Sequence, residues 1–110
     1  MMIKKIFWTM AAISLMQVLF GCSQPEEVVR HGKHYQQHHD YYSLSCVVNL
    51  VKQDADKAYL KKILGEPIDM GFDYRYLIDS TGENGCPIGA VFHFSDQKVV
   101  DDLWIGEICE

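Results

Sequence analysis

No apolar stretch in this sequence is long enough to cross a membrane as a helix. The main apolar run, Ile6–Phe20, has about 15 residues, whereas a spanning helix needs about 20. Lys4 and Lys5 precede the run, and a polar segment beginning at Ser23 follows it. A positive head, a short apolar middle and a polar break are typical of a secretory signal peptide. We therefore expect residues 1–21 to be removed on export.

Basic side chains are scarce in the part that remains. Loss of residues 1–21 leaves 89 residues, and because both signal lysines are lost with it, Lys and Arg fall from 10 to 8 against 15 Asp and Glu. The resulting net charge of −7, with histidine neutral, argues against nucleic acid or an anionic lipid surface as a partner. Attachment to a membrane would then depend on a covalent lipid. A chain of this length forms one small domain.

The common catalytic motifs are also missing. The sequence has no Gly-x-Ser-x-Gly, His-Glu-x-x-His or phosphate-binding loop. It predicts no catalytic residue, no cofactor and no small-molecule substrate. His93 and Asp102 are expected to face each other across a hairpin, but a surface pair of this kind is usually structural.

A histidine-rich segment, residues 31–39, is a candidate metal site. His31, His34 and His38 share one face of a helix with Asp40 nearby, and imidazoles so placed can bind Zn²⁺ or Cu²⁺. Histidines more than one turn apart cannot all reach a single ion without ligands from elsewhere. A solvated start of a helix is the simpler interpretation, so we assign no metal ligand.

The end of the apolar run has a specific pattern. Leu19-Phe20-Gly21-Cys22 resembles the lipobox of bacterial lipoproteins, which implies that Cys22 is lipidated and becomes the mature N-terminus. Ser23 follows in place of Asp, and by the same resemblance this favours the outer membrane, facing the periplasm. Residues 22–27 would form a tether and residues 28–110 the domain. Ordinary secretion with Cys22 as a plain thiol is the alternative.

The apolar periodicity predicts an α+β fold with two helices packed on a three-stranded antiparallel sheet, in the order helix-helix-β-β-β. The first helix covers residues 26–51. The second has Asp54 as its predicted N-cap, and Gly65 and Pro67 end it. From Phe72 the apolar period changes from 3.6 to 2, as in a half-buried strand.

Two further strands form a hairpin with its turn near Asp96–Gln97. Export favours disulfides, and Cys86 lies opposite Cys109 if paired residue numbers sum to 195. Because Cα atoms about 5.5 Å apart across a strand pair can be bridged, Cys86–Cys109 is the preferred disulfide, with Cys46 reduced and buried. Cys46–Cys109 is the rival. Asp101 falls on the apolar face in this register, which requires a bulge or a strand end.

The opposite face of the hairpin carries Val91, Val100 and Trp104. An exposed strip of aliphatic and aromatic side chains on a sheet is typical of a docking surface. We therefore predict that these three residues bind a protein partner. The alternative is that the first helix or the end of the chain covers them.

Two segments, DADKAYLKKILGEPIDMGFDYRYLID and AVFHFSDQKVVDDLWI, share a further pattern with a known family. A short helix ends in Leu-Gly-x-Pro, and a strand with an aromatic-x-Tyr core precedes a Val-Phe-x-Phe strand. This pattern, over residues 54–107, resembles the SmpA/OmlA (BamE-like) family of outer-membrane lipoproteins. The resemblance implies a helix-helix-β-β-β fold and a binding role beside the β-barrel assembly machinery. The histidine-rich segment and the cysteines of the domain depart from the family pattern.

Together these features predict a lipid-anchored envelope protein that acts as a non-catalytic, protein-binding accessory or scaffold in outer-membrane assembly or integrity. An alternative from a different class is a periplasmic inhibitor or immunity lipoprotein that neutralises a toxin or hydrolase. Small size, acidity and a disulfide suit that role as well.

Overall fold

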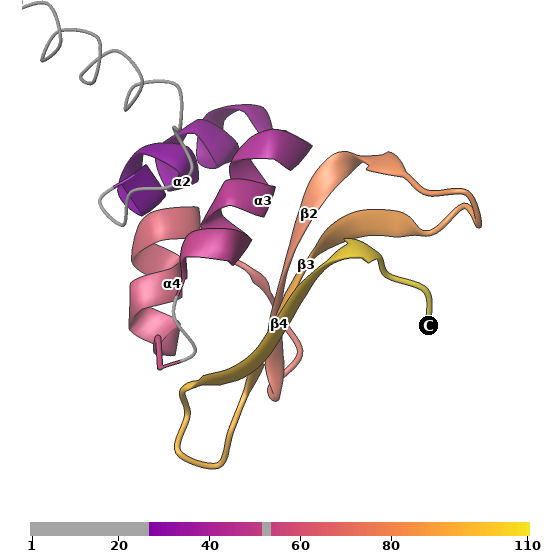
Figure 1. Ribbon diagram of the computed structural model, residues 1–110. Helices are drawn as coiled ribbons and strands as arrows, with labels where there is room; N and C mark the ends of the chain where they lie inside the picture. Colours follow the sequence, from indigo (N-terminus) through magenta and orange to yellow (C-terminus); the bar gives the residue numbers. More distant parts are fainter. Residues whose placement is uncertain (1–26, 52–53) are drawn as a thin grey trace, which may run out of the picture.

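The computed structural model describes residues 27–51 and 54–110, which form three helices and a four-stranded antiparallel sheet (Figure 1). The elements in chain order are α2 (Glu27–His38), α3 (Tyr41–Leu50), α4 (Lys57–Leu64), β1 (Ile68–Asp69), β2 (Asp73–Thr81), β3 (Pro87–Phe94) and β4 (Val100–Glu107). The strands lie side by side in that order, and the helices pack on one face of the sheet. The α+β class is confirmed, but the prediction of two helices and three strands missed one of each.

The additional helix arises because the predicted helix over residues 26–51 is broken. His39 adopts a left-handed φ of 50°, and the Asp40 carboxylate then caps α3 by accepting a hydrogen bond from the Ser43 N–H at 3.0 Å. Burial raises the pKa of Asp40, but hydrogen bonds from Ser43 and His34 outweigh it and leave the pKa lowered. A capping aspartate followed by a helix is a strong start signal, and the break lets α2 and α3 pack against each other.

The last helix begins two residues later than the sequence predicts. Asp56, not Asp54, is the N-cap of α4 and accepts from the Tyr59 N–H at 2.8 Å. The reason is tertiary, since Asp56 also forms an isolated β-bridge with Val99, which holds the segment before α4 extended. Gly65 ends α4 with a φ of 87°, which confirms the predicted stop.

Gly32 lies inside α2, where glycine disfavours a helix, but it is needed for packing. A Cβ atom built at Gly32 would lie 2.2 Å from the carbonyl oxygen of Ile63. Any side chain at this position would therefore push α2 away from α4.

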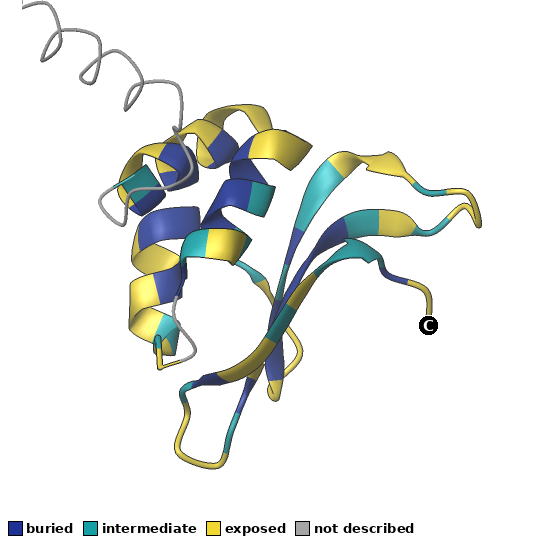
Figure 2. Cartoon of the chain, in the orientation of Figure 1, coloured by how far each residue is buried: buried dark blue, intermediate teal, exposed yellow. Residues whose placement is uncertain are grey.

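The core lies between the helices and the inner face of the sheet (Figure 2). Phe92 is fully buried and packs edge-to-face against Tyr76, at 5.8 Å between ring centroids. The Tyr76 hydroxyl donates to the Gly65 carbonyl at 3.0 Å, and the Tyr35 hydroxyl donates to the Leu77 carbonyl at 2.5 Å. Burial raises the pKa of Tyr35 to about 12. These hydroxyls therefore stay protonated and join the helix layer to β2.

The short strand β1 pairs with the first residues of β2 and was not predicted. It has two residues directly after Pro67, which is too short to show a period of 2. The register of the predicted hairpin is confirmed over most of its length, with Ala90 opposite Ile105 and Phe92 opposite Leu103.

Candidate functional site

The face of the sheet that points away from the three described helices is the candidate site. Strand pairing places its side chains in rows that run across β2, β3 and β4. One row is Asp73, His93 and Asp102, and the next is Arg75, Val91 and Trp104. We call these six residues, with Leu77, the outer sheet face.

Trp104 is the large apolar side chain that this face exposes, at 41%. Val91 belongs to the same row but is only 5% exposed, because Arg75 and Trp104 flank it on the two neighbouring strands. Of the three predicted binding residues, Trp104 is therefore accessible. Val91 lies beside it on the predicted face but is buried, so the prediction that Val91 is available to a partner is wrong.

Val100 does not belong to this face, and the prediction that it does is wrong. It is fully buried in the core and pairs with Phe94, whose side chain faces the helices. The pairing register shifts between His93 and Phe94, which leaves Asp101 as the extra residue of a β-bulge. One extra residue in a strand shifts the pairing by one, so the side chains of β4 that precede Asp101 point to the opposite face from the one that the regular register predicts. Of the two explanations that the sequence left open at Asp101, a bulge or a strand end, the structure shows the bulge, and it transfers Val100 to the core.

The bulge also gives His93 an acidic partner. The Asp101 carboxylate lies 2.7 Å from Nδ1 of His93, although the residue directly opposite His93 is Asp102. The hydrogen bond to Asp101 is the main cause that raises the pKa of His93, and the charges of Asp73 and Asp102 add to it. His93 is therefore charged over a wider pH range than a free histidine.

Phe72 was missed as a surface residue. Its position two residues before Tyr74 predicted a place in the core, but it is 57% exposed and its ring lies 6.3 Å from that of His93. Phe72 precedes the first residue of β2 and follows Gly71, which has a φ of 90°. The alternation of side chains along a strand does not hold through such a turn. A glycine followed by an aromatic residue at the start of a strand is the sequence signal that could have indicated the exposure of Phe72.

Arg75 lies at the other end of its row and contacts two carboxylates. Its Nε donates to Asp73 at 3.3 Å, and its Nη1 donates to Glu110. The bond to Glu110 is the main cause that raises the pKa of Arg75, which keeps the guanidinium charged. Asp73 is 4% exposed, so this pair neutralises a buried carboxylate.

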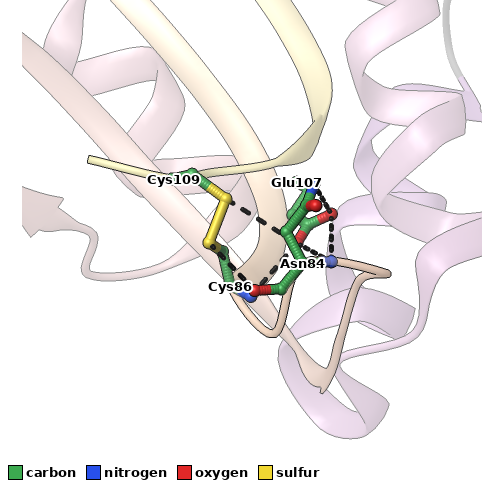
Figure 3. The surroundings of a disulfide bond; sticks show 4 residues. All are labelled: Asn84, Cys86, Glu107 and Cys109. Atoms are coloured by element: carbon green, nitrogen blue, oxygen red, sulfur yellow. Dashed lines mark hydrogen bonds between the residues drawn. A yellow bond between two sulfur atoms is a disulfide. The ribbon is translucent and has the colours of Figure 1, made fainter.

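A disulfide closes the far end of the hairpin (Figure 3). Cys86 and Cys109 are bonded with their Cα atoms 5.3 Å apart, which confirms the preferred pairing and rules out the rival Cys46–Cys109. The Glu107 carboxylate accepts from the N–H groups of Asn84 at 2.9 Å and Cys86 at 3.1 Å, and so fixes the preceding loop. Cys46 is buried as expected but is disulfide-bonded, so the prediction that it is reduced is wrong.

The histidine-rich segment does not form a convergent ligand set. His34 contacts Asp40 at 2.9 Å and Ser43 at 2.7 Å, both through Nδ1, while His31 is buried. Within residues 27–51 and 54–110, the one group of three such side chains whose ligand atoms converge is Cys86, Glu107 and Cys109. Its two sulfur atoms are consumed by the disulfide.

Cys22, the predicted lipidation site, lies outside the described residues. Among the residues that are described, no helix is long and apolar enough to cross a membrane. No family model, curated protein or solved structure matches this chain.

Proposed function

We propose that this chain is a non-catalytic protein that binds another envelope protein through the outer sheet face. The observation that carries the proposal is the exposure of Trp104 at 41% on a face opposite the three described helices. Phe72, at 57%, extends the apolar surface along the same side. Tryptophan is enriched among the residues that dominate protein interfaces.

The rest of the outer sheet face suits a polar rim around this centre. His93 and Asp102 of this face, together with the bulged residue Asp101, are exposed near Trp104. Interfaces commonly place charged side chains around an aromatic core. The acidic groups favour a partner whose facing surface is apolar with basic residues at its edge.

The capture experiment compares three forms of the protein in intact cells. Truncation of a central tryptophan costs on the order of 2 kcal/mol of binding, or about thirtyfold in affinity. Trp104→Ala should therefore abolish crosslinked capture, while Tyr59→Ala, which removes an aromatic of similar exposure from α4, should capture the partner as the wild type does. Equal capture by both variants would contradict the proposal.

The identity of the captured protein decides between the two function classes. Components of outer-membrane assembly would support the accessory role and the resemblance to BamE-like lipoproteins. A single secreted effector or hydrolase would instead favour the inhibitor alternative.

We further infer that Cys22 carries lipid and anchors the protein to the outer membrane, facing the periplasm. The support is the Leu19–Cys22 pattern followed by Ser23. Cys22→Ala should yield an unprocessed or soluble protein, whereas the wild type should fractionate with outer membranes. Wild-type protein found free in the periplasm would contradict the anchor.

Peptide mapping without reduction gives an independent test of the anchor. Because Cys86 and Cys109 are bonded to each other, Cys22 is the one other cysteine of the sequence that could bond to Cys46. A thioether-linked lipid requires the same sulfur atom of Cys22, so the lipid proposal requires that the mature protein lacks the disulfide that the structure gives Cys46. A lipid-bearing peptide that contains Cys22 is the expected product. A crosslink between the peptides of Cys22 and Cys46 would contradict lipidation.

A further inference from the structure

A groove of about 500 Å³ lies beside the outer sheet face. It runs between β1 and the residues that follow β4, Ile108 and Glu110. This volume is within the range of about 300–1,000 Å³ that is common for ligand sites. The walls are mostly apolar and are formed by Ile68, Met70, Leu77, Pro87 and Ile108. Arg75 is the cationic side chain that lines the groove.

The guanidinium of Arg75 contacts a buried carboxylate through one nitrogen and an exposed carboxylate through another. Asp73 is buried and bonds to Nε, which fixes the plane of the group. A guanidinium has five N–H donors in a fixed geometry that matches carboxylates. The terminal nitrogen Nη1 therefore faces a second carboxylate position inside the groove.

Glu110 occupies that second position with an exposed side chain. Its carboxylate accepts from Nη1 of Arg75, yet 62% of the side chain is exposed, against 16% for Arg75. Ion pairs that water can reach contribute little net free energy, because solvent satisfies both groups almost as well. Another carboxylate can replace Glu110 at small cost without disturbing the Arg75–Asp73 pair.

We propose that this groove is a subsite for a carboxylate adjacent to an apolar side chain, as at the C-terminus of a peptide segment of the partner. Arg75 would bind the carboxylate, the apolar walls would bury the neighbouring side chain, and Glu110 is an internal occupant that the ligand displaces. We choose a carboxylate as the ligand on grounds of charge, because Arg75 already donates to a carboxylate of its own chain at this position. The subsite rests on the proposed function, since it belongs to the same docked partner.

The direct test is an NMR titration of the purified protein with a matched pair of probes. The probes are acetyl-Leu-Leu with a free carboxylate and the same dipeptide as its amide, and the reporter is the Arg75 Nε–H signal. The acid should shift this signal and bind about tenfold more tightly than the amide, as expected for the loss of one charge-assisted hydrogen bond. Equal binding of the two probes, or no shift of the Arg75 signal by the acid, would overturn the proposal.

Two variants separate the roles of the charged groups. Glu110→Gln should strengthen binding of the acid by about threefold, because it removes a weak competing ion pair, while Asp96→Asn in the exposed β3–β4 turn should change nothing. Arg75→Lys keeps a charge for Asp73 but loses the planar fork, and it should weaken binding of the acid and reduce its preference over the amide. Weaker binding of the acid to Glu110→Gln would contradict the displacement, and an unchanged preference in Arg75→Lys would contradict recognition of the carboxylate by the guanidinium.

Partner capture distinguishes failure of the subsite from failure of the proposed function. If capture depends on Trp104 but is unchanged by Glu110→Gln and Arg75→Lys, the subsite is refuted and the docking face stands. If capture does not depend on Trp104, the docking face is refuted, and the acid and amide titration still decides whether the groove binds carboxylates.

Discussion

The two faces of the sheet share the same strands but differ in what their aromatic side chains contact. Phe92 on the inner face is fully buried against Tyr76 and the helices, whereas Trp104, on the neighbouring strand and the outer face, is 41% exposed. Both are large aromatic residues in β-strands, so residue type does not distinguish them. Their parity along the strand does, because successive side chains point to opposite faces. Stability is thus concentrated on one face and accessible apolar surface on the other.

Truncation of Phe92 is expected to have the largest effect on folding. Phe92→Ala should lower the free energy of unfolding by about 3–5 kcal/mol, the usual cost of removing a buried phenylalanine. Trp104→Ala should cost less than about 1 kcal/mol, because its side chain is partly in solvent already. Urea denaturation of both variants measures the difference. Similar losses would mean that the outer sheet face is part of the core.

Removal of the disulfide should have the next largest effect. The double variant Cys86→Ser, Cys109→Ser should be less stable by about 2–4 kcal/mol, measured by denaturation without reductant. Glu107→Gln in the intact protein is the matched control, since it weakens the same corner through its hydrogen bonds to Asn84 and Cys86 and should cost less. A double variant as stable as the wild type would show that the bond does not constrain the hairpin.

The smallest expected effect is the pH dependence of the stability that the His93–Asp101 pair contributes. The Asp101 carboxylate raises the pKa of His93 in the folded protein, so the pair stabilises the fold fully below the unfolded pKa. This stabilisation is lost as pH rises through the folded pKa. Asp101→Asn should return the NMR titration midpoint of His93 toward its ordinary value near 6.5. A wild-type midpoint at or below that value would contradict the pairing.

The sequence predicted much of the sheet because alternation and register are local properties. The pairing of Phe92 with Leu103 and the Cys86–Cys109 bond follow from a single odd sum of paired residue numbers. The same argument failed at Val100, because one bulged residue changes the parity of everything before it. The sequence indicated an irregularity at Asp101. It did not show whether the residues before or after Asp101 would change face.

The helix layer was less predictable because its decisive contacts are tertiary. The break at His39–Asp40 contains no proline or glycine, and α2 and α3 pack against each other across it. The choice of Asp56 over Asp54 depends on Val99, which is distant in sequence. For the candidate site, Trp104 was found by parity, whereas Phe72 and the Arg75 groove depend on turns and on the path of residues 108–110.

Site-specific photocrosslinking in intact cells tests the central claim most directly. A photoreactive amino acid is placed at position 104 on the outer sheet face and, as the control, at position 59 on the exposed side of α4. The account predicts a discrete crosslinked partner from position 104 and none of that product from position 59. The same product from both positions, or a product from position 59 alone, would show that the outer sheet face is not the docking surface.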